Sequence, residues 1–384
     1  MSEWKKVKLG DCCEITSSKR IFFSEYVESG IPFYRSKEII EKGKGEEISH
    51  PLYISKEKYD EIKGKYGVPQ KGDLLLTAVG SLGIPFVVKD DSPFYFKDGN
   101  LVWLKHFQDI DPIFLYYWIK SENGYNALYN IAIGSAQKAL TIAAIKGYGI
   151  PLPPLQTQHR IATILSRYDS LIENYQKQIK LLEEAAQRLY KEWFIDLRFP
   201  GHENTKIVDG LPEGWERKKV GDIAPIITGK KDANFGTPDG EYPFFTCSQE
   251  PIKAPSFSFD CAAVLLSGNG DFNVKLYRGK FEAYQRTYVL SPCCAQHLYL
   301  LYYTISANMT KLAAGSSGST IKFLTKGMID GINLNVPNDE ILESFNKKVE
   351  PIQSSRESLQ SQLCLLTEAR DRLLPKLMSG EITV

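Results

Sequence analysis

The sequence QTQHRIATILSRYDSLIENYQKQIKLLEEAAQRLYKEWFIDLR fills residues 156–198, and its apolar residues recur in alternating steps of four and three. This spacing predicts one long helix with a coiled-coil seam, because it keeps a narrow apolar stripe on one face. About 40 residues at about 1.5 Å each give a helix of roughly 60 Å. The predicted seam consists of Ile161, Leu165, Tyr168, Ile172, Tyr175, Ile179, Leu182, Ala186, Leu189 and Trp193.

A helix with a single apolar stripe needs a partner, and the C-terminal part of the chain supplies one. LLEEAAQRL at 181–189 is answered by LLTEARDRL at 365–373, an offset of 184. We expect the two helices to pack antiparallel with opposing positions summing to 538, which places Arg370 against the ring of Tyr168. The matching seam is Phe345, Val349, Ile352, Arg356, Leu359, Leu363, Leu366, Arg370, Leu373 and Leu377.

The segments before the two helices also repeat. WKKVKLGD at 4–11 returns as WERKKVGD at 215–222, and short apolar runs follow each copy. Asn338 is suited to cap the second long helix, because its amide oxygen can accept from a backbone N–H in the first helical turn. The runs predict strands at 74–79, 101–104, 264–267 and 281–290 and a helix at 112–120. A polar loop at 134–138 leads into residues 141–146.

The chain is therefore predicted to belong to the α+β class, as two tandem α/β domains separated by two long helices that form an antiparallel coiled coil. The expected boundaries are 1–152 and 200–337 for the domains, and 153–199 and 338–384 for the helices. The second domain is shorter, and the two copies differ most in their middles. That difference is typical of one scaffold that carries two different binding surfaces.

Charge and cysteine usage restrict the kind of site that is possible. Residues 1–152 carry 20 Lys and Arg against 19 Asp and Glu, and residues 200–337 carry 14 against 13. A surface for an acidic partner must therefore come from the placement of charge or from a second subunit. Seven cysteines without a CxxC pair, and no apolar run near 18 residues, favour a cytoplasmic protein with reduced thiols and no membrane segment.

The sequence contains no recognisable catalytic motif. The only double proline, at 153–154, lacks the flanking polar residues of a DNA methyltransferase motif, and Gly268-Asn269-Gly270 lacks a third glycine and a following helix. The five histidines pair with no Cys or acidic residue at ligand spacing, so we expect no metal site. Binding is therefore favoured over catalysis.

These phrases together resemble the specificity subunits of Type I restriction–modification systems. The resemblance is carried by PLPPLQTQHRI at 151–161, the loop GSAQK at 134–138, the WKKVKLGD opening and GDLLLT at 72–77. It covers nearly the whole chain, and the order of the phrases appears twice. The second copy departs at 335–338, where NVPN replaces the double-proline entry to the helix.

The resemblance implies that each domain recognises one half of a split double-stranded DNA target and that the helix pair sets the gap. The implied protein partners are two methyltransferase (modification) subunits and the restriction/translocase subunits. These would hold S-adenosylmethionine, ATP and Mg, so this chain would bind no cofactor and be no enzyme itself. Two alternatives remain open: a structural coiled-coil scaffold, and a reader fused to a methyltransferase or restriction enzyme.

Polar loop residues are the candidates for DNA contact, since Lys, Arg, Asn, Gln and Ser can bond to phosphates and base edges. In the first domain they are Lys19, Arg20, Arg35, Ser36, Thr77, Gly80, Ser81, Lys97, Asn100, Gln137 and Lys138. In the second they are Lys230, Lys231, Asn234, Thr246, Ser248, Ser267, Asn269, Asn273, Lys275, Tyr284, Gln285, Arg286, Ser317, Ser319 and Lys322.

Overall fold

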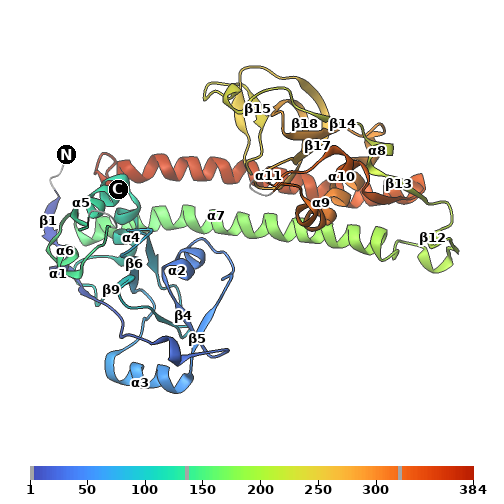
Figure 1. Cartoon of the computed structure of the whole chain (residues 1–384). Coiled ribbons are helices and arrows are strands. Elements are labelled where there is room, and N and C mark those ends of the chain that lie inside the picture. The colour runs from blue at the N-terminus through green and yellow to red at the C-terminus, as the bar shows by residue number, and fades with distance from the viewer. Residues whose placement is uncertain (1–3, 135–137, 319–321) are drawn as a thin grey trace. The chain divides into compact units, whose positions relative to one another are not determined.

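The computed structural model describes residues 4–134, 138–318 and 322–384, and the chain divides into two compact units. Unit 1 consists of Met1–Lys177 and Ser361–Val384, and unit 2 consists of Gln178–Gln360. Each unit combines a globular domain with part of both long helices, α7 (Leu155–Tyr190) and α11 (Asp339–Met378) (Figure 1). The class is α+β, as the sequence predicts.

Unit 1 contains two four-stranded sheets and a separate strand pair. In chain order its globular elements are β1 (Lys5–Lys8), α1 (Leu9–Cys12), β2 (Glu14–Thr16), β3 (Tyr26–Val27), β4 (Ile31–Tyr34), α2 (Ser36–Gly43), β5 (Leu52–Ile54), α3 (Lys56–Tyr66), β6 (Leu74–Thr77), β7 (Pro85–Val87), β8 (Tyr95–Phe96), β9 (Leu101–Lys105), α4 (Pro112–Lys120), α5 (Glu122–Ile131), α6 (Ile142–Gly147) and β10 (Gly149–Leu152). The sheet orders are β2-β9-β6-β7 and β3-β5-β4-β8.

Unit 2 joins its main strands into one six-stranded sheet. Its globular elements are β11 (Ile207–Val208), β12 (Leu211–Pro212), β13 (Glu216–Lys219), α8 (Val220–Ile223), β14 (Ile226–Thr228), β15 (Tyr242–Phe245), β16 (Ile252–Ala254), β17 (Phe259–Ser267), β18 (Val274–Ala283), β19 (Thr287–Leu290), α9 (Leu298–Gly315), α10 (Lys326–Asp330) and β20 (Asn333–Val336). The sheet order is β14-β19-β17-β18-β15-β16.

The two domains share one strand plan. The order β14-β19-β17-β18 in unit 2 repeats β2-β9-β6-β7 in unit 1. β18 also pairs parallel with β15, as β8 pairs parallel with β4, so the single long β18 replaces both β7 and β8. Unit 1 adds α2 and α3 to this plan, which accounts for part of its greater length.

The repeated opening phrase forms the same strand pair in each unit. β1 pairs antiparallel with β10, with Lys5 opposite Leu152, and β13 pairs antiparallel with β20, with Glu216 opposite Val336. In both cases the second strand leads directly into a long helix. The start of each domain is therefore fixed beside its end.

The apolar seams of α7 and α11 are covered along their lengths. Every predicted seam residue on either helix is buried or partly buried. In unit 1, Ile161 and Leu165 of α7 share a core with Leu377 of α11. In unit 2, the ring centroids of Trp193 and Phe345 lie 5.9 Å apart. In unit 1, Asp169 also pairs with Arg370, so the partner number on α11 falls as the residue number on α7 rises. In unit 2, Glu183 pairs with Arg356 and Trp193 with Phe345, which gives the same opposite direction. The predicted antiparallel packing is therefore confirmed within each unit.

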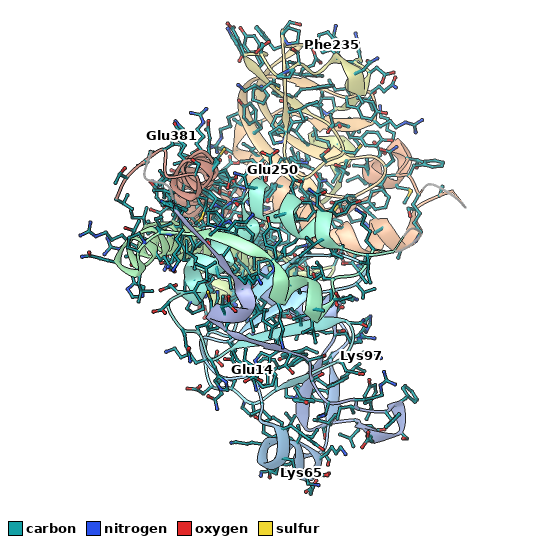
Figure 2. All side chains as sticks on the ribbon, turned by 90° about the vertical axis from the view of Figure 1, so that its left-hand side faces the viewer. Glu14, Lys65, Lys97, Phe235, Glu250 and Glu381 are labelled. Carbon is teal, nitrogen blue, oxygen red and sulfur yellow. The ribbon has the colours of Figure 1, made fainter. Side chains whose placement is uncertain are left out.

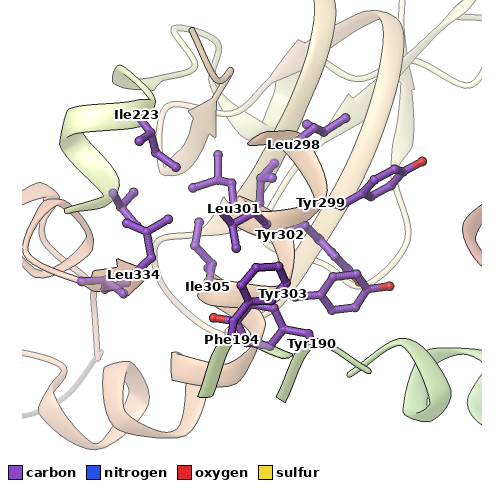
Figure 3. Packing of buried hydrophobic residues seen from close by; sticks show 14 of the residues in the cluster. Tyr190, Phe194, Ile223, Leu298, Tyr299, Leu301, Tyr302, Tyr303, Ile305 and Leu334 are labelled. Carbon is purple, nitrogen blue, oxygen red and sulfur yellow. The ribbon is translucent and has the colours of Figure 1, made fainter. Parts of the chain in front are cut away.

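A buried helix from each domain packs on this pair. In unit 2, α9 inserts LYLLYYTI between the sheet and the long helices. Figure 3 shows Tyr303 beside Tyr190 of α7 and Phe194 of the π-helical turn that follows it. The Tyr190 hydroxyl also lies 3.0 Å from that of Thr304. In unit 1, α4 takes the same place, and the Tyr117 hydroxyl donates to Asp169 Oδ2 on α7 at 2.7 Å.

The start of α7 is fixed by one buried amide. Gln158 is 1% exposed, and its Oε1 accepts from the backbone N–H of Asp111 at 2.9 Å. Its Nε2 donates to the carbonyls of Asp109 and Pro153 at 3.1 and 2.9 Å. The second glutamine of PLPPLQTQHRI therefore ties α7 to the loop before α4. Asn338 caps α11 as predicted, accepting from Ile341 N at 3.0 Å.

Two sequence-based boundaries are wrong. The α-helix predicted to reach residue 198 ends at Tyr190 and continues only as a π-helical turn, Lys191–Ile195. The strand predicted over 281–290 is two strands, β18 and β19, because the chain turns at 284–286. The strands β6, β9 and β17 and the helix α4 lie where their runs predict, with boundaries that differ by at most five residues. The segment that follows the polar loop at 134–138 forms the helix α6, which the sequence patterns do not predict.

The predicted contact of Arg370 with the Tyr168 ring is also wrong. Arg370 Nη1 instead bonds to Asp169 Oδ1 at 2.8 Å, so these opposing positions sum to 539 rather than 538. In unit 2, Arg356 pairs with Glu183 and gives the same sum. Burial opposes the charge of Arg370, but hydrogen bonds to Asp169 and Asp371 outweigh it and raise its pKa. A carboxylate fixes this guanidinium more strongly than a ring would.

We expect Arg370→Glu to destabilise the protein by about 3 kcal/mol and lower its melting temperature by roughly 5–10 °C, measured by calorimetry. The substitution removes a partly buried ion pair and sets a third carboxylate beside Asp169 and Asp371. Arg372→Glu is the matched control, because the Arg372 side chain is 78% exposed and, within the described part of the chain, pairs only with Glu368 on the same helix. It should shift the melting temperature by less than about 2 °C. Equal losses from both substitutions would contradict the assigned register.

Candidate nucleic-acid interface

In unit 2, three loops meet at the end of β17. Gly268, directly after the strand, donates its N–H to the carbonyl of Arg286 at 2.8 Å, and its own carbonyl accepts from Leu324 N at 2.8 Å. The third loop is closed by reciprocal hydrogen bonds between Ser317 and Phe323 at 3.0 and 2.8 Å. These three loops are therefore joined to one another by bonds between backbone groups.

Unit 1 builds the same arrangement at the end of β6. Ala78 N donates to the carbonyl of Asn100 at 2.8 Å, and Leu140 N donates to the carbonyl of Ala78 at 2.9 Å. Ile133 and Ala139 close the third loop with reciprocal bonds of 2.9 and 2.8 Å. Each bond has its counterpart in unit 2, so the two sites are structural repeats.

A pocket opens at this place in each unit. In unit 2 it has a volume of about 330 Å³ and is lined by Thr228, Gly268, Gln285, Arg286 and Tyr288. In unit 1 it has a volume of about 360 Å³ and is lined by Ser17, Ser18, Ala78, Asp98, Gly99, Leu101, Val102, Leu140 and Ile142. The frame is shared but the lining side chains differ.

Several candidates in unit 2 are engaged inside the domain. Lys275 Nζ donates to the carbonyl of Ser248 at 2.7 Å and to the side-chain oxygen of Asn273. Asn273 is buried and donates to the carbonyl of Cys247 at 3.0 Å, and Asn269 Oδ1 accepts from the Cys247 thiol at 2.8 Å. Burial lowers the pKa of Lys275. These side chains hold the loop after β17 against the turn at 246–250.

Thr246 and Ser267 belong to the same internal network. The Thr246 hydroxyl lies 3.1 Å from that of Ser248, and Ser267 is 1% exposed and donates to the carbonyl of Cys247 at 3.4 Å. A side chain as buried as Ser267 lies beyond the reach of a duplex on the surface. Ser267 instead helps to hold the end of β17 against the turn at 246–250.

The loop at 229–235 packs against the loop at 284–286. Lys231 Nζ lies 4.3 Å from the centre of the Phe235 ring, and Gln285 N donates to the Lys231 carbonyl at 2.9 Å. Tyr284 is partly buried and forms a parallel bridge with Lys231. The cation of Lys231 is thus held over a ring, while the neighbouring polar residues point outward.

The remaining described candidates of unit 2 have exposed polar side chains. Within the described residues, these side chains have neither an ion-pair nor a hydrogen-bond partner. They are Lys230, Asn234, Gln285, Arg286, Ser317 and Lys322. Ser319 lies outside the described residues.

In unit 1, both candidate arginines are paired. Arg20 Nε donates to Asp98 Oδ2 at 2.9 Å, and Arg35 bonds to Glu38, which is buried. The side-chain hydrogen bond from Arg35 to Glu38 raises the pKa of Arg35. Pairing leaves each guanidinium with fewer free donors for a phosphate.

Two lysines of unit 1 lie over tyrosine rings. Lys19 Nζ is 4.5 Å from the centre of the Tyr66 ring, and Lys138 Nζ is 3.6 Å from that of Tyr129. Such contacts stabilise a cation without neutralising it. Lys19 is exposed, whereas Lys138 is partly buried and also donates to the Tyr129 carbonyl at 3.3 Å. Gln137 lies outside the described residues.

Thr77 and Ser36 hold the loops of unit 1 in shape. Thr77 is 0% exposed; its hydroxyl donates to the carbonyl of Ser81 and accepts from Ile84 N at 2.8 Å. The Ser36 hydroxyl donates to the carbonyl of Asn100 at 3.2 Å. The Thr77 side chain is therefore too buried to contact DNA directly.

The outward residues of unit 1 are Gly80, Ser81, Lys97 and Asn100. Gly80 and Ser81 are exposed, whereas Lys97 and Asn100 are partly exposed, and Figure 2 places Lys97 at the outer edge of this unit. Within the described residues, the side chains of Lys97 and Asn100 have no ion-pair or hydrogen-bond partner.

The structure adds residues that the sequence reasoning missed. Ser17 and Ser18 line the pocket of unit 1, and Thr228 and Tyr288 line that of unit 2. The Ser18 hydroxyl is buried and has no hydrogen-bond partner within the described residues. Ser17 and Ser18 directly precede the candidates Lys19 and Arg20. Thr228 lies two residues before the candidate Lys230. The same polar loops could therefore have indicated these residues.

Two further searches concern the described residues alone. In that part of the chain, no three His, Cys, Asp or Glu side chains are grouped so that they could hold a metal ion. None of the helices there is both long and apolar enough to cross a membrane.

The shared strand plan, the helix pair and the doubled loop site define a two-domain repeat protein with two related binding surfaces. The family described as Type I restriction modification DNA specificity domain matches residues 1–184 and 212–357. The chain belongs to this family.

Individual relatives agree with this assignment. The EcoDI specificity subunit of Escherichia coli is 37% identical over 177 residues, which cover 45% of this chain and 40% of that subunit. The MjaIX specificity subunit of Methanocaldococcus jannaschii is 27% identical over 351 residues, covering 82% of this chain and 78% of that subunit. The first of these matches thus spans less than half of the relative's length.

A solved structure shows the same fold. The Type I restriction–modification S subunit from M. genitalium aligns with a TM-score of 0.68 and 17% identity, covering 97% of this chain and 96% of that one. Two tandem domains with two long helices are therefore a shared architecture.

Proposed function

We propose that this chain selects the DNA sequence for a Type I restriction–modification complex, and that each unit recognises one half of a bipartite target. The observation that carries the proposal is the three-loop site, built twice on the same backbone hydrogen bonds and lined by different side chains. A repeated frame with different linings is suited to two different base sequences. Phosphate contacts position such a protein, and base contacts specify its site.

The chemistry is assigned to partner subunits. Two modification subunits would carry S-adenosylmethionine and methylate the target, and restriction/translocase subunits would use ATP and Mg. The near balance of charge in each domain supports this division, because phosphate neutralisation supplies much of the affinity for DNA. A scaffold without DNA recognition leaves the doubled polar sites unexplained.

The direct test is to co-express the chain with its modification subunits in a host without other adenine methylation and to map the modified bases. We expect one motif with two specified halves separated by a gap of fixed length. Exchanging residues 200–337 for those of another specificity subunit should change one half only. A single contiguous motif, or methylation without this chain, would refute the proposal.

Exposed leucines on the long helices are candidates for docking the modification subunits. Leu181 of α7 is 63% exposed and Leu365 of α11 is 65% exposed. Their positions differ by 184, the offset that relates the two seams, and both lie outside those seams. A repeated apolar site suits two copies of one partner, since exposed leucines gain free energy when a partner covers them.

We expect Leu181→Glu and Leu365→Glu each to remove one of two modification subunits, and the double variant to remove both. The carboxylate would have to be buried at the contact. Native mass spectrometry of the co-purified complex gives the stoichiometry. Gln176→Glu is the matched control, because it adds the same charge about 140° around α7 from Leu181. A double variant that retains both copies would exclude this surface.

The helix pair is also proposed to set the gap between half-sites. α7 and α11 each run from one unit into the other without interruption, at Lys177/Gln178 and Gln360/Ser361. A continuous helix changes length only by whole residues. The length of the gap should therefore change with the length of the two helices. The bases recognised in each half-site should stay the same.

Four residues inserted after Gln176, together with four after Gln362, should widen the gap by one or two base pairs. The insertions lengthen both helices by about 6 Å, and each base pair adds about 3.4 Å of duplex. Methylome sequencing of the variant measures the gap. The control is the same insertion after the exposed Asp209, between β11 and β12, which should leave the gap unchanged. An unchanged gap with altered half-site bases would defeat this part of the proposal.

A further inference from the structure

One position is equivalent in the two sites and carries a different base-reading side chain in each. Asn100 and Arg286 both accept, through their carbonyls, the N–H of the first residue after the central strand, at 2.8 Å in each unit. Each is also the last residue before the next strand, β9 or β19. The backbone is therefore fixed at the same place, while the side chain differs.

The backbone of Arg286 is held closely and its side chain is left free. A Cβ atom at Gly268 would lie 2.5 Å from the Arg286 carbonyl oxygen, so glycine is needed there for the hydrogen bond. The Arg286 side chain is exposed and, within the described residues, has no ion-pair or hydrogen-bond partner. It borders the pocket beside Gln285, whose side chain is free in the same sense.

The four lysine candidates of unit 2 are less suited than Arg286 to recognise a base. Lys275 is bonded within the domain, and Lys231 lies over the Phe235 ring. Lys230 and Lys322 are exposed, but an ammonium on a flexible chain acts as a point charge and suits phosphates. Arg286 alone among these candidates has a planar fork of donors on an anchored backbone.

In unit 1 the equivalent position is held by Asn100. Asn100 is partly exposed, and its amide has no hydrogen-bond partner within the described residues. The nearby Arg20 is paired with Asp98, so it does not compete for the same place. In the adjoining pocket the buried Ser18 hydroxyl has no hydrogen-bond partner within the described residues.

We infer that this position determines one base pair in each half-site: Arg286 reads a guanine and Asn100 reads an adenine. The inference rests on the proposed function and names the specificity residues within it. An arginine fork donates two hydrogen bonds to guanine O6 and N7, and an asparagine amide both donates to and accepts from adenine N7 and N6. The two halves of the target should therefore differ in composition at this point.

The experiment uses the complex of the full chain with its modification subunits and a duplex library in which both half-sites are randomised. Methylated duplexes are sequenced for the parent protein and for Arg286→Ala and Asn100→Ala. Arg286→Ala should relax one guanine position in one half, with discrimination falling about five- to hundred-fold. Asn100→Ala should relax one adenine position in the other half only.

Arg217→Ala is the control, since Arg217 is an exposed arginine of the same unit on β13, outside the loop site. It should leave every position unchanged. Asn100→Arg should exchange the adenine preference for guanine in its own half.

Uniform loss of methylation in Arg286→Ala, with no position relaxed, would show a phosphate contact and overturn the inference while leaving the proposed function intact. A parent half-site without the expected guanine would do the same. If the parent complex methylates no bipartite sequence, the proposed function and the inference both fail.

Discussion

The structure depends on the burial of two narrow apolar seams, one on α7 and one on α11. A helix of this length with a single apolar stripe is stable only when another helix covers that stripe. The ends of the seams also enter the domain cores, where Ile161 packs with the core of unit 1 and Val349 with that of unit 2. Folding each domain and pairing the helices are therefore one process.

Polar groups then fix the register that the seam alone leaves free. Heptad side chains tolerate small axial shifts, whereas a guanidinium and a carboxylate bond only at defined distances. Asp169 takes part in two such bonds, to Arg370 on α11 and to Tyr117 on α4, at 2.8 and 2.7 Å. In unit 2, Glu183 likewise meets Arg356 and the Tyr302 hydroxyl. Each domain is thus joined to both helices through one carboxylate.

The sequence predicts repetition well and side-chain partners poorly. Periodicity and repeated phrases are enough for the α+β class, the antiparallel pair and the cap at Asn338, because these follow from local spacing. Whether Arg370 meets a ring or a carboxylate differs by one residue of register, which spacing does not resolve. In the same way, Arg286 and Lys275 look alike as loop cations, but only tertiary structure shows that one is free and the other engaged.

The division between backbone and side chain explains how the two sites can differ while the fold stays the same. The bonds that join the loops, such as Gly268 to Arg286 and Ala78 to Asn100, use only main-chain atoms. A change of side chain at Arg286 or at Asn100 therefore breaks no bond of the frame, whereas Gly268 must stay a glycine. Arg20, Arg35 and Lys275 are bonded within their domains, whereas Arg286 is exposed and has no such partner within the described residues. The side chains of each loop site can therefore differ between the units while the backbone frame stays the same.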